Sequence, residues 1–272
     1  MQGLHDFVPT ERKVAYIQQL LAVGFDVLDV GSFVSPKAIP QMADTAQVLR
    51  SLDLSRTNTK LLVIVANTRG AQAAVEHERV DYLGYPFSVS ETFQLRNTNA
   101  TIDESYERLE RIIELCRVHG KGLVVYLSMG FGNPYGDAWN VGIVAQYARE
   151  LIDRGVSVLQ LSDTIGVSTP ASIGYLFEGL SATFPEVTFG AHLHTTPDTW
   201  REKVEAAYAA GCRRFDGAIA GYGGCPMAAD KLTGNMPTER LIDYLHPRGA
   251  GHIDLPAFER ARAAAVQLFP AL

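Results

Sequence analysis

The sequence has no excess of positive charge. Its 272 residues include 24 Lys and Arg against 30 Asp and Glu, a formal net charge of −6, and charged residues make up only 20% of the chain. Proteins that bind a phosphate backbone neutralise it with clustered Lys and Arg. The composition therefore argues against nucleic acid as the main partner.

Cysteine is also scarce. The chain holds three, Cys116, Cys212 and Cys225, too few and too scattered for a disulfide framework or a four-thiolate zinc site. We therefore expect a reducing compartment, the cytoplasm. Cys116 and Cys212 fall in or beside helical patterns, where a cysteine behaves as a small hydrophobic residue.

Long apolar runs are missing as well. No uninterrupted stretch approaches the ~20 residues that span a bilayer. The first residues, MQGLHDFVPTERK, do not show the basic and then apolar pattern of a secretory signal. We expect a soluble protein without a membrane partner.

The sequence does contain a regular alternation of short apolar runs and longer amphipathic stretches. Hydrophobic residues make up 47% of the chain, enough for a substantial core, and no linker or composition break divides it, so we expect one domain over 1–272. Alternation of this kind is typical of a parallel sheet. The seven predicted strands are 27–31, 60–65, 82–87, 123–128, 158–162, 189–194 and 214–219.

Helical patterns occupy the intervals between these runs. Thr101 and Glu104 form a capping-box pattern at the start of one of them, and Gly24, Gly120 and Gly155 stand where helices end. The predicted helices are 11–22, 44–51, 71–77, 102–119, 139–154, 170–183, 198–210, 238–245 and, at the C-terminus, about 256–268.

Two architectures fit this pattern, a closed eightfold barrel and an open doubly wound sheet. Polar residues stand at the ends of many different strands, and no glycine-rich nucleotide fingerprint opens the first unit. Both observations favour the α/β barrel of the TIM type.

His192 and His194 form the most informative motif. They end an apolar strand at positions i and i+2, so both imidazoles point to one face of the sheet. Two neutral imidazoles that converge in this way can bind a divalent metal. The alternative is a pair of hydrogen-bonded structural histidines.

A glycine-rich segment, AGYGGCP, follows the last strand and leads to Gly234 and Asn235. Glycines at this density allow unusual backbone conformations and permit a loop to open and close. The pattern indicates a lid over an active site, with Cys225 at its tip as an acid or nucleophile.

Carboxylates stand at two further strand ends, Asp29 and Asp163. A carboxylate at the C-terminal rim of a barrel can bind metal, orient a base or take a proton, although an Asp can also simply cap a turn. The irregular segment 32–44 follows Asp29, and its Ser32 and Lys37 could bind a carboxylate or phosphate, unless the loop is purely structural.

Taken together, four blocks of sequence resemble the hydroxymethylglutaryl-CoA lyase family, metal-dependent lyases built on a TIM barrel. The blocks are SFVSPKAIPQMAD, SDTIGVSTP, HLH, and AGYGGCP with the later GN. They lie in the family's order with compatible spacing, from about residue 9 to about residue 245, and so cover nearly the whole chain.

The resemblance implies cleavage of 3-hydroxy-3-methylglutaryl-CoA, an intermediate of leucine degradation, to acetyl-CoA and acetoacetate with Mg²⁺ or Mn²⁺. Carried over by motif, His192, His194 and Asn235 would be metal ligands, and His192 would also be placed for proton transfer. Asp29, in the place of a family Glu, and Cys225 would be catalytic. The substrate-binding residues would be Ser32 and Asp163, and Asp163 would also support the metal histidines. The partners implied are an acyl-CoA substrate and a second copy in a homodimer.

Besides Asp29 in the place of a Glu, the chain departs from the family pattern at two further places. It reads His192-Leu193-His194-Thr195-Thr196 where the family commonly has HCHDT, and it has no counterpart of the Arg-Asp pair that ends the family's first strand. We therefore expect a barrel that lacks its first strand. A related Claisen-type synthase or aldolase, and a barrel without catalytic activity, remain alternatives.

Overall fold

The computed structural model describes residues 1, 4, 6–224, 233–249 and 251–269. Within these residues the chain forms two compact units. The first comprises Met1–Gly84, Leu115–Gly122 and Ile242–Leu272, and the second comprises Tyr85–Glu114 and Leu123–Leu241. The prediction of a single domain stays a prediction.

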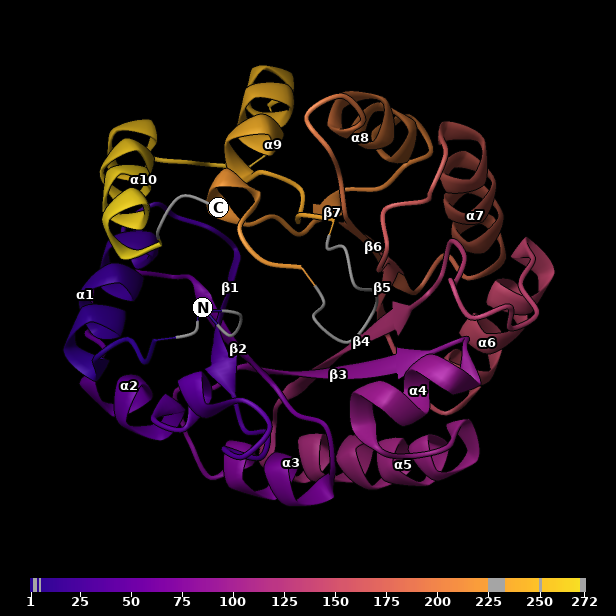
Figure 1. Ribbon diagram of the computed structural model, residues 1–272, viewed down its shortest axis with the longest axis horizontal. Coiled ribbons are helices and arrows are strands. Elements are labelled where there is room, and N and C mark those ends of the chain that lie inside the picture. Colours follow the sequence, from indigo (N-terminus) through magenta and orange to yellow (C-terminus); the bar gives the residue numbers. More distant parts are fainter. Residues whose placement is uncertain (2–3, 5, 225–232, 250, 270–272) are drawn as a thin grey trace. The chain divides into compact units, whose positions relative to one another are not determined.

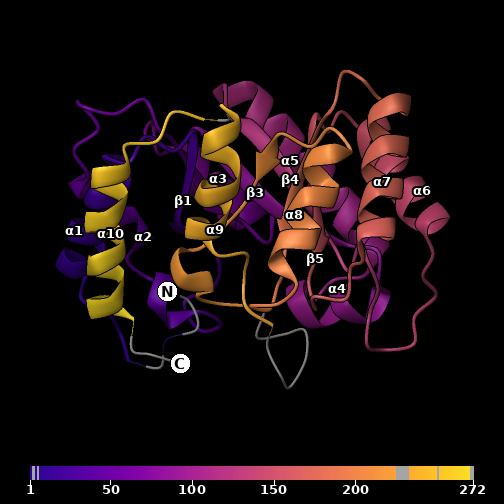
Figure 2. The ribbon, with the colours of Figure 1, turned by 90° about the horizontal axis from the view of Figure 1, so that it is seen from above.

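The first unit contains a parallel sheet of β1 (Val27–Ser32), β2 (Lys60–Ile64) and the start of β3 (Tyr82–Ser88). Its helices are α1 (Thr10–Leu21), α2 (Thr45–Ser51), α3 (Thr68–Val75) and α10 (Leu255–Leu268), together with the short 3₁₀ helices η1 (Pro40–Met42) and η3 (His246–Arg248). Helices α1 and α10 lie side by side although they come from opposite ends of the sequence (Figures 1 and 2).

The second unit carries β4 (Gly122–Ser128), β5 (Val158–Asp163), β6 (Thr188–Leu193) and β7 (Arg214–Phe215), again paired in parallel. Its helices are α4 (Glu91–Thr98), α6 (Val141–Asp153), α7 (Pro170–Thr183), α8 (Trp200–Ala209) and the 3₁₀ helix η2 (Ile219–Gly221). Helices α5 (Ile102–His119) and α9 (Thr238–Leu245) contribute residues to both units. Helix α7 packs against α6 on one side and α8 on the other (Figure 1).

Strand order follows chain order from β1 to β7. Parallel strands in sequential order, each followed by a helix, define the (β/α)₈ fold, and the described residues contain seven of its eight strands. The structure thus confirms the predicted fold class, including the absence of one strand from the described chain.

Side chains on the strands of the second unit alternate between two environments. One face of this sheet carries buried apolar residues, which the pairing aligns with one another: Val125, Leu127, Leu159, Leu161 and Ala191. The intervening positions are polar or small. Pairing aligns Tyr126 with Gln160, Gln160 with Gly190 and Gly190 with Arg214. The next such pair toward the C-terminal ends is Ser162 with His192, so the histidines lie on the polar face.

Most predicted elements are confirmed to within a few residues, but the last strand is much shorter than expected. Only Arg214–Phe215 pairs with β6, whereas the prediction ran to residue 219. The backbone N–H of Ala218 instead donates to the carbonyl of Met236, and Ala218 forms an isolated bridge with Pro237. The segment around Met236 therefore pairs with Ala218 and with the end of β6, where a longer β7 would have paired.

Helix α4 is absent from the sequence prediction. Its residues, ETFQLRNT, have no clear apolar stripe, although Phe93 and Gln94 are buried, and both of its ends are capped. The Ser90 side chain accepts a hydrogen bond from the Phe93 N–H, and Asn99 ends the helix in the left-handed conformation. The predicted capping box of α5 is confirmed, since Thr101 and Glu104 exchange hydrogen bonds of 2.9 and 3.1 Å.

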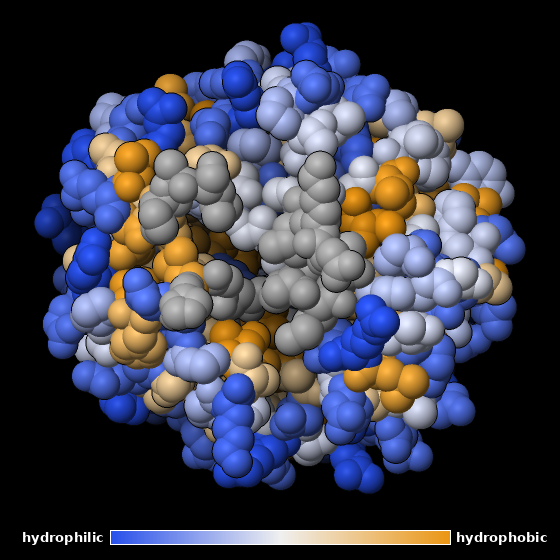
Figure 3. All heavy atoms as spheres, in the orientation of Figure 1, coloured by the Kyte–Doolittle hydropathy of each residue, from blue (hydrophilic) through white to orange (hydrophobic). Residues whose placement is uncertain are grey.

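Hydrophilic residues, coloured blue, predominate over the face shown in Figure 3. In the part of the chain that the structure describes, no helix combines the length and the apolarity needed to cross a membrane. Cys116 and Cys212 are buried as predicted, and burial raises the pKa of Cys116 to about 11 and that of Cys212 to about 12. Both thiols are therefore protonated and unreactive at neutral pH.

Candidate active site

The two histidines of the HLH motif lie together, as their spacing predicts. His192 belongs to β6 and His194 follows its last residue, and their ring centroids are 5.6 Å apart. The His192 side chain is 31% exposed, whereas His194 is buried at 3%. One imidazole thus reaches solvent and the other is enclosed by protein.

Each histidine is held through its Nδ1 atom. His192 Nδ1 lies 3.0 Å from Oδ2 of Asp216, just beyond β7, and His194 Nδ1 lies 2.9 Å from the carbonyl oxygen of Thr233. A carboxylate and a carbonyl can only accept, so Nδ1 carries the proton in both rings. In the neutral form of either ring Nε2 then carries the lone pair, and this is the form in which imidazole binds a metal.

Burial fixes the protonation state of His194. Its pKa is lowered to about 4, first because the ring is desolvated and second because His192 lies beside it; the bond to Thr233 opposes this shift. His194 is consequently neutral over the whole physiological range. A neutral ring needs to lose no proton before it binds a cation.

The third predicted ligand, Asn235, is brought beside His194 by an antiparallel bridge between the two residues. The Thr195 N–H donates to the Gly234 carbonyl, and the Met236 N–H donates to the Leu193 carbonyl. The Asn235 Nδ2 atom donates to the Tyr222 carbonyl at 2.8 Å. This bond fixes the amide orientation and leaves Oδ1 as the atom available to a ligand.

These donors fit a hard divalent cation. Two imidazole nitrogens and one amide oxygen suit Mn²⁺ or Mg²⁺, which also accept oxygens from water or substrate. No cluster of three or more His, Cys, Asp and Glu residues with metal-binding geometry occurs among the described residues. The proposed ligand set is not of this kind, because its third ligand, Asn235, is an amide.

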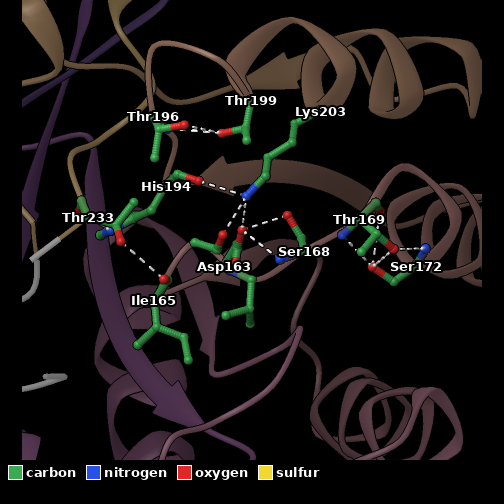
Figure 4. Close-up of polar contacts among 12 residues, drawn as sticks. Asp163, Ile165, Ser168, Thr169, Ser172, His194, Thr196, Thr199, Lys203 and Thr233 are labelled. Carbon is green, nitrogen blue, oxygen red and sulfur yellow. Dashed lines mark hydrogen bonds and ion pairs between the residues drawn. The ribbon is translucent and has the colours of Figure 1, made fainter.

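Asp163 is enclosed in a polar network near His194 (Figure 4). Its Oδ1 accepts from the Val167 N–H at 2.8 Å, and its Oδ2 accepts from the N–H and hydroxyl of Ser168 and from Nζ of Lys203 at 2.7 Å. Its side chain is 0% exposed. This geometry favours a supporting role for Asp163 over direct contact with substrate.

Asp29 and Ser32 belong to the first unit. Asp29 is exposed on β1, and its Oδ1 accepts from the Gly31 N–H at 3.1 Å across a pairing irregularity. Ser32 is buried at 5%, and its hydroxyl has no hydrogen-bond partner within the described part of the chain. A buried, unpartnered hydroxyl is consistent with a binding role, and both assignments stay predictions.

Cys225 lies outside the described residues, so its predicted role stays a prediction. The segment that leads to it has the backbone that its glycines imply: φ is +66° at Gly221, +95° at Gly223 and +155° at Gly224. Lys37, the candidate phosphate contact, is exposed. A second cation, Arg96, stacks on the ring of Tyr135 at 4.7 Å from its centroid.

Three residues of the site escaped sequence reasoning. Asp216 lies inside the predicted strand 214–219 and follows Arg213, Arg214 and Phe215, so it lacks the strand-end signal that drew attention to Asp29 and Asp163. Thr233 contributes only its backbone to His194, and Lys203 lies within a helix. The sequence carries no local signal for these two contacts.

Comparison with known proteins identifies the family of the chain. The family model described as HMGL-like matches residues 1–264. A lyase of Pseudomonas aeruginosa, 3-hydroxy-3-isohexenylglutaryl-CoA/hydroxy-methylglutaryl-CoA lyase, is 34% identical over 234 residues, which cover 86% of this chain and 77% of that protein.

Solved structures give the same result. The HMG-CoA lyase of Brucella melitensis superposes with a TM-score of 0.90 at 31% identity, covering 98% of this chain and 94% of that one. An HMG-CoA lyase of Acinetobacter baumannii, in complex with coenzyme A and 3-methylmalate, gives 0.89 at 29% identity, covering 98% and 87%. The chain described here belongs to the HMGL-like family.

Proposed function

We propose that this protein is a carbon–carbon lyase that cleaves 3-hydroxy-3-methylglutaryl-CoA to acetyl-CoA and acetoacetate. One observation carries the proposal. The rings of His192 and His194 lie next to each other, Asn235 is bridged to His194, and each of the three side chains is held by a hydrogen bond. The proposal is also supported by relatives that carry this activity in their names and match most of the chain.

The bound cation would be held by Nε2 of His192, Nε2 of His194 and Oδ1 of Asn235. When bound, a divalent cation supplies Lewis-acid chemistry, which makes a substrate hydroxyl easier to deprotonate and stabilises the charge of a forming carbonyl. Enzymes of the HMGL-like family are generally dependent on a divalent metal. We propose Mg²⁺ or Mn²⁺ for this chain because its donor set contains no thiolate.

The reaction requires one proton to leave and another to arrive. Removal of the C3 hydroxyl proton allows the C2–C3 bond to break: C3 becomes the ketone carbonyl of acetoacetate, and the electron pair passes to the thioester enolate. That enolate takes up a proton and becomes acetyl-CoA. We assign the first transfer to the Asp29 carboxylate or to His192, and the second to Cys225.

The remaining residues bind and orient. Asp216 holds His192 in the tautomer whose Nε2 is unprotonated, and Thr233 does the same for His194. We assign Ser32 to contact with the substrate. The acyl-CoA substrate is supported by the coenzyme A bound to a relative, and we propose Lys37 and Arg96 for its phosphates. A cytoplasmic homodimer completes the proposal.

A second substrate, with an isohexenyl group at C3, should be tested in the same assay. The P. aeruginosa relative is named for an isohexenyl as well as a methyl substituent at C3. Only the group at C3 differs between these substrates, so the same chemistry serves both.

The test is a thioester-cleavage assay of the purified protein after treatment with EDTA. We expect acetoacetate and acetyl-CoA to appear only after addition of Mn²⁺ or Mg²⁺, and His192→Ala to lower the rate at least a hundredfold. Asp198→Ala, which changes an exposed carboxylate on the neighbouring loop, is the matched control and should leave the rate unchanged. Stoichiometric Mn²⁺ binding without cleavage of either substrate would reject the lyase assignment, and condensation of acetyl-CoA with a keto acid would favour a synthase.

A further inference from the structure

Lys203 is the most deeply buried cation in the described chain. It lies near the start of α8, and its side chain is only 1% exposed. Burial of a charged amine is costly unless every donor is matched. The residues around Lys203 Nζ therefore have to supply a hydrogen-bond acceptor for each of its three protons.

The three protons of the ammonium group meet three acceptors. Nζ lies 2.7 Å from Oδ2 of Asp163, 3.0 Å from the Gly166 carbonyl and 3.0 Å from the His194 carbonyl. These acceptors come from the end of β5, the loop that follows it, and the residue after β6 (Figure 4). Lys203 thus joins three segments, one of which contains a proposed metal ligand.

A second set of hydrogen bonds links the loop after β5 to His194 through Thr233. The Thr233 hydroxyl donates to the Ile165 carbonyl at 3.2 Å, and the Thr233 carbonyl accepts from His194 Nδ1 at 2.9 Å. Gly166 lies directly against Thr233, since a Cβ atom at Gly166 would come within 2.6 Å of Thr233 Cγ2. His194 is therefore held at both ends, its ring by Thr233 and its backbone carbonyl by Lys203.

The same hydrogen bonds also affect the third proposed ligand, Asn235. Thr233 precedes Gly234, whose carbonyl accepts from the Thr195 N–H at 2.9 Å, and then Asn235, which is bridged to His194. Displacement of the loop after β5 would move Thr233, and with it both the acceptor of the His194 ring and the approach of Asn235.

From these contacts we propose that Lys203 is a positioning residue. Together with Asp163 it fixes the loop after β5 and the His194 backbone, so that His194 Nε2 and Asn235 Oδ1 are placed for the cation before it binds. The inference rests on the proposed metal site of the lyase. It adds a residue that touches neither cation nor substrate, and it gives the Asp163 carboxylate a defined task.

The test compares Lys203→Met with Lys13→Met. Lys13 is the matched control because it is also buried, at 3%, and pairs with Asp44 at 2.6 Å, but it belongs to the first unit. Both variants lose one buried ion pair. In a Mn²⁺ titration followed by electron paramagnetic resonance, we expect Lys203→Met to raise the dissociation constant roughly tenfold to a hundredfold, and Lys13→Met to change it less than twofold.

The double variant Asp163→Asn/Lys203→Met tests whether misfolding of Lys203→Met, rather than loss of the Lys203 hydrogen bonds, weakens metal binding. This double variant removes both charges, so no uncompensated carboxylate remains buried, and its folding is checked by circular dichroism. Methionine cannot donate to the His194 carbonyl, so we expect the folded double variant to keep the raised dissociation constant. Wild-type affinity in either folded variant, or an equal loss in Lys13→Met, would overturn the proposal.

A measurement on the metal-free protein separates this inference from the proposed function. In ¹⁵N NMR spectra of the histidine rings, wild-type His194 should be a single Nδ1–H tautomer, and Lys203→Met should shift or broaden that resonance while His246 is unchanged. An unaltered His194 resonance would overturn the positioning role whatever the metal titration gives. A shifted resonance in a protein that binds no Mn²⁺ would retain the link from Lys203 to His194 and reject the metal site instead.

Discussion

Oδ2 of Asp216 lies 3.0 Å from Nδ1 of His192, across neighbouring strands. This contact orients a partly exposed imidazole, because the carboxylate accepts the Nδ1 proton and so leaves Nε2 as the nitrogen that faces away from Asp216. The edge of the His192 ring also meets the Tyr126 ring, with centroids 5.4 Å apart. The histidine is thus fixed in both its tautomer and its plane.

Removal of this carboxylate should weaken the metal site without unfolding the protein. In Asp216→Ala, His192 loses its acceptor and can rotate or change tautomer, so we expect Mn²⁺ to bind about ten to a hundred times more weakly. Isothermal titration calorimetry measures the change. Asp198→Ala should keep the wild-type affinity, and equal affinities in all three proteins would show that Asp216 does not orient His192.

Stability should fall in mild acid because of His194. Its pKa is about 4 in the folded protein against 6.5 for an unperturbed histidine. Between these values the unfolded chain holds more protons than the folded one, so the free energy of unfolding decreases as pH falls through the window from 6.5 to 4. The contribution is fully present above pH 6.5, and its loss amounts to about 3 kcal/mol.

Urea unfolding at several pH values in the presence of EDTA measures this loss. His194→Asn removes the titrating group, so its stability should depend less steeply on pH between 6.5 and 4 than that of the wild type. His246→Asn, which changes an exposed histidine, should retain the wild-type slope. The same slope in all three proteins would contradict the assignment.

Gly166 should tolerate no side chain while Thr233 keeps its methyl group. The residue has φ of +75°, and an added Cβ would lie 2.6 Å from Thr233 Cγ2. We expect Gly166→Ala to cost about 1–2 kcal/mol from backbone conformation alone, and more from the clash. Thermal unfolding of Gly166→Ala and of Gly166→Ala/Thr233→Ser separates the two parts. If the second substitution restored no stability, the clash would not exist.

Gly190 should be similarly intolerant for a different reason. An added Cβ would lie 1.5 Å from Oε1 of Gln160, whose fully buried amide crosses the glycine and has no hydrogen-bond partner among the described residues. We expect Gly190→Ala to lower the free energy of unfolding by about 1–3 kcal/mol. Gly190→Ala/Gln160→Ala should recover part of this loss in the same unfolding assay, whereas a further loss would place the clash elsewhere.

Local sequence was enough to predict the regular elements. The apolar runs of β4 and β5 and the capping box at Thr101 depend on neighbouring residues, so they were found correctly. The spacing of His192 and His194 was equally informative, because alternation along a strand places i and i+2 on one face. Helix α4 was missed because its residues show no apolar stripe and its caps at Ser90 and Asn99 are the main local signals of its bounds.

The length of β7 could not be read from its own residues. RFDGAI is a plausible strand, but Ala218 pairs with the segment around Pro237 instead of continuing along β6. Two stretches about twenty residues apart compete for the same backbone partners, and their relative positions decide the outcome. The same return of the chain places Asn235 beside His194.

The sequence by itself determined the alternation of strands and helices, the family, and which residue types gather at the strand ends. Only the tertiary structure decided how those residues are held: Asp216 against His192, the Thr233 carbonyl against His194, and Lys203 between Asp163 and the His194 backbone. The physical reason is that periodicity and propensity act over a few residues, whereas each of these bonds joins groups from 9 to 40 residues apart and exists only after the strands have paired.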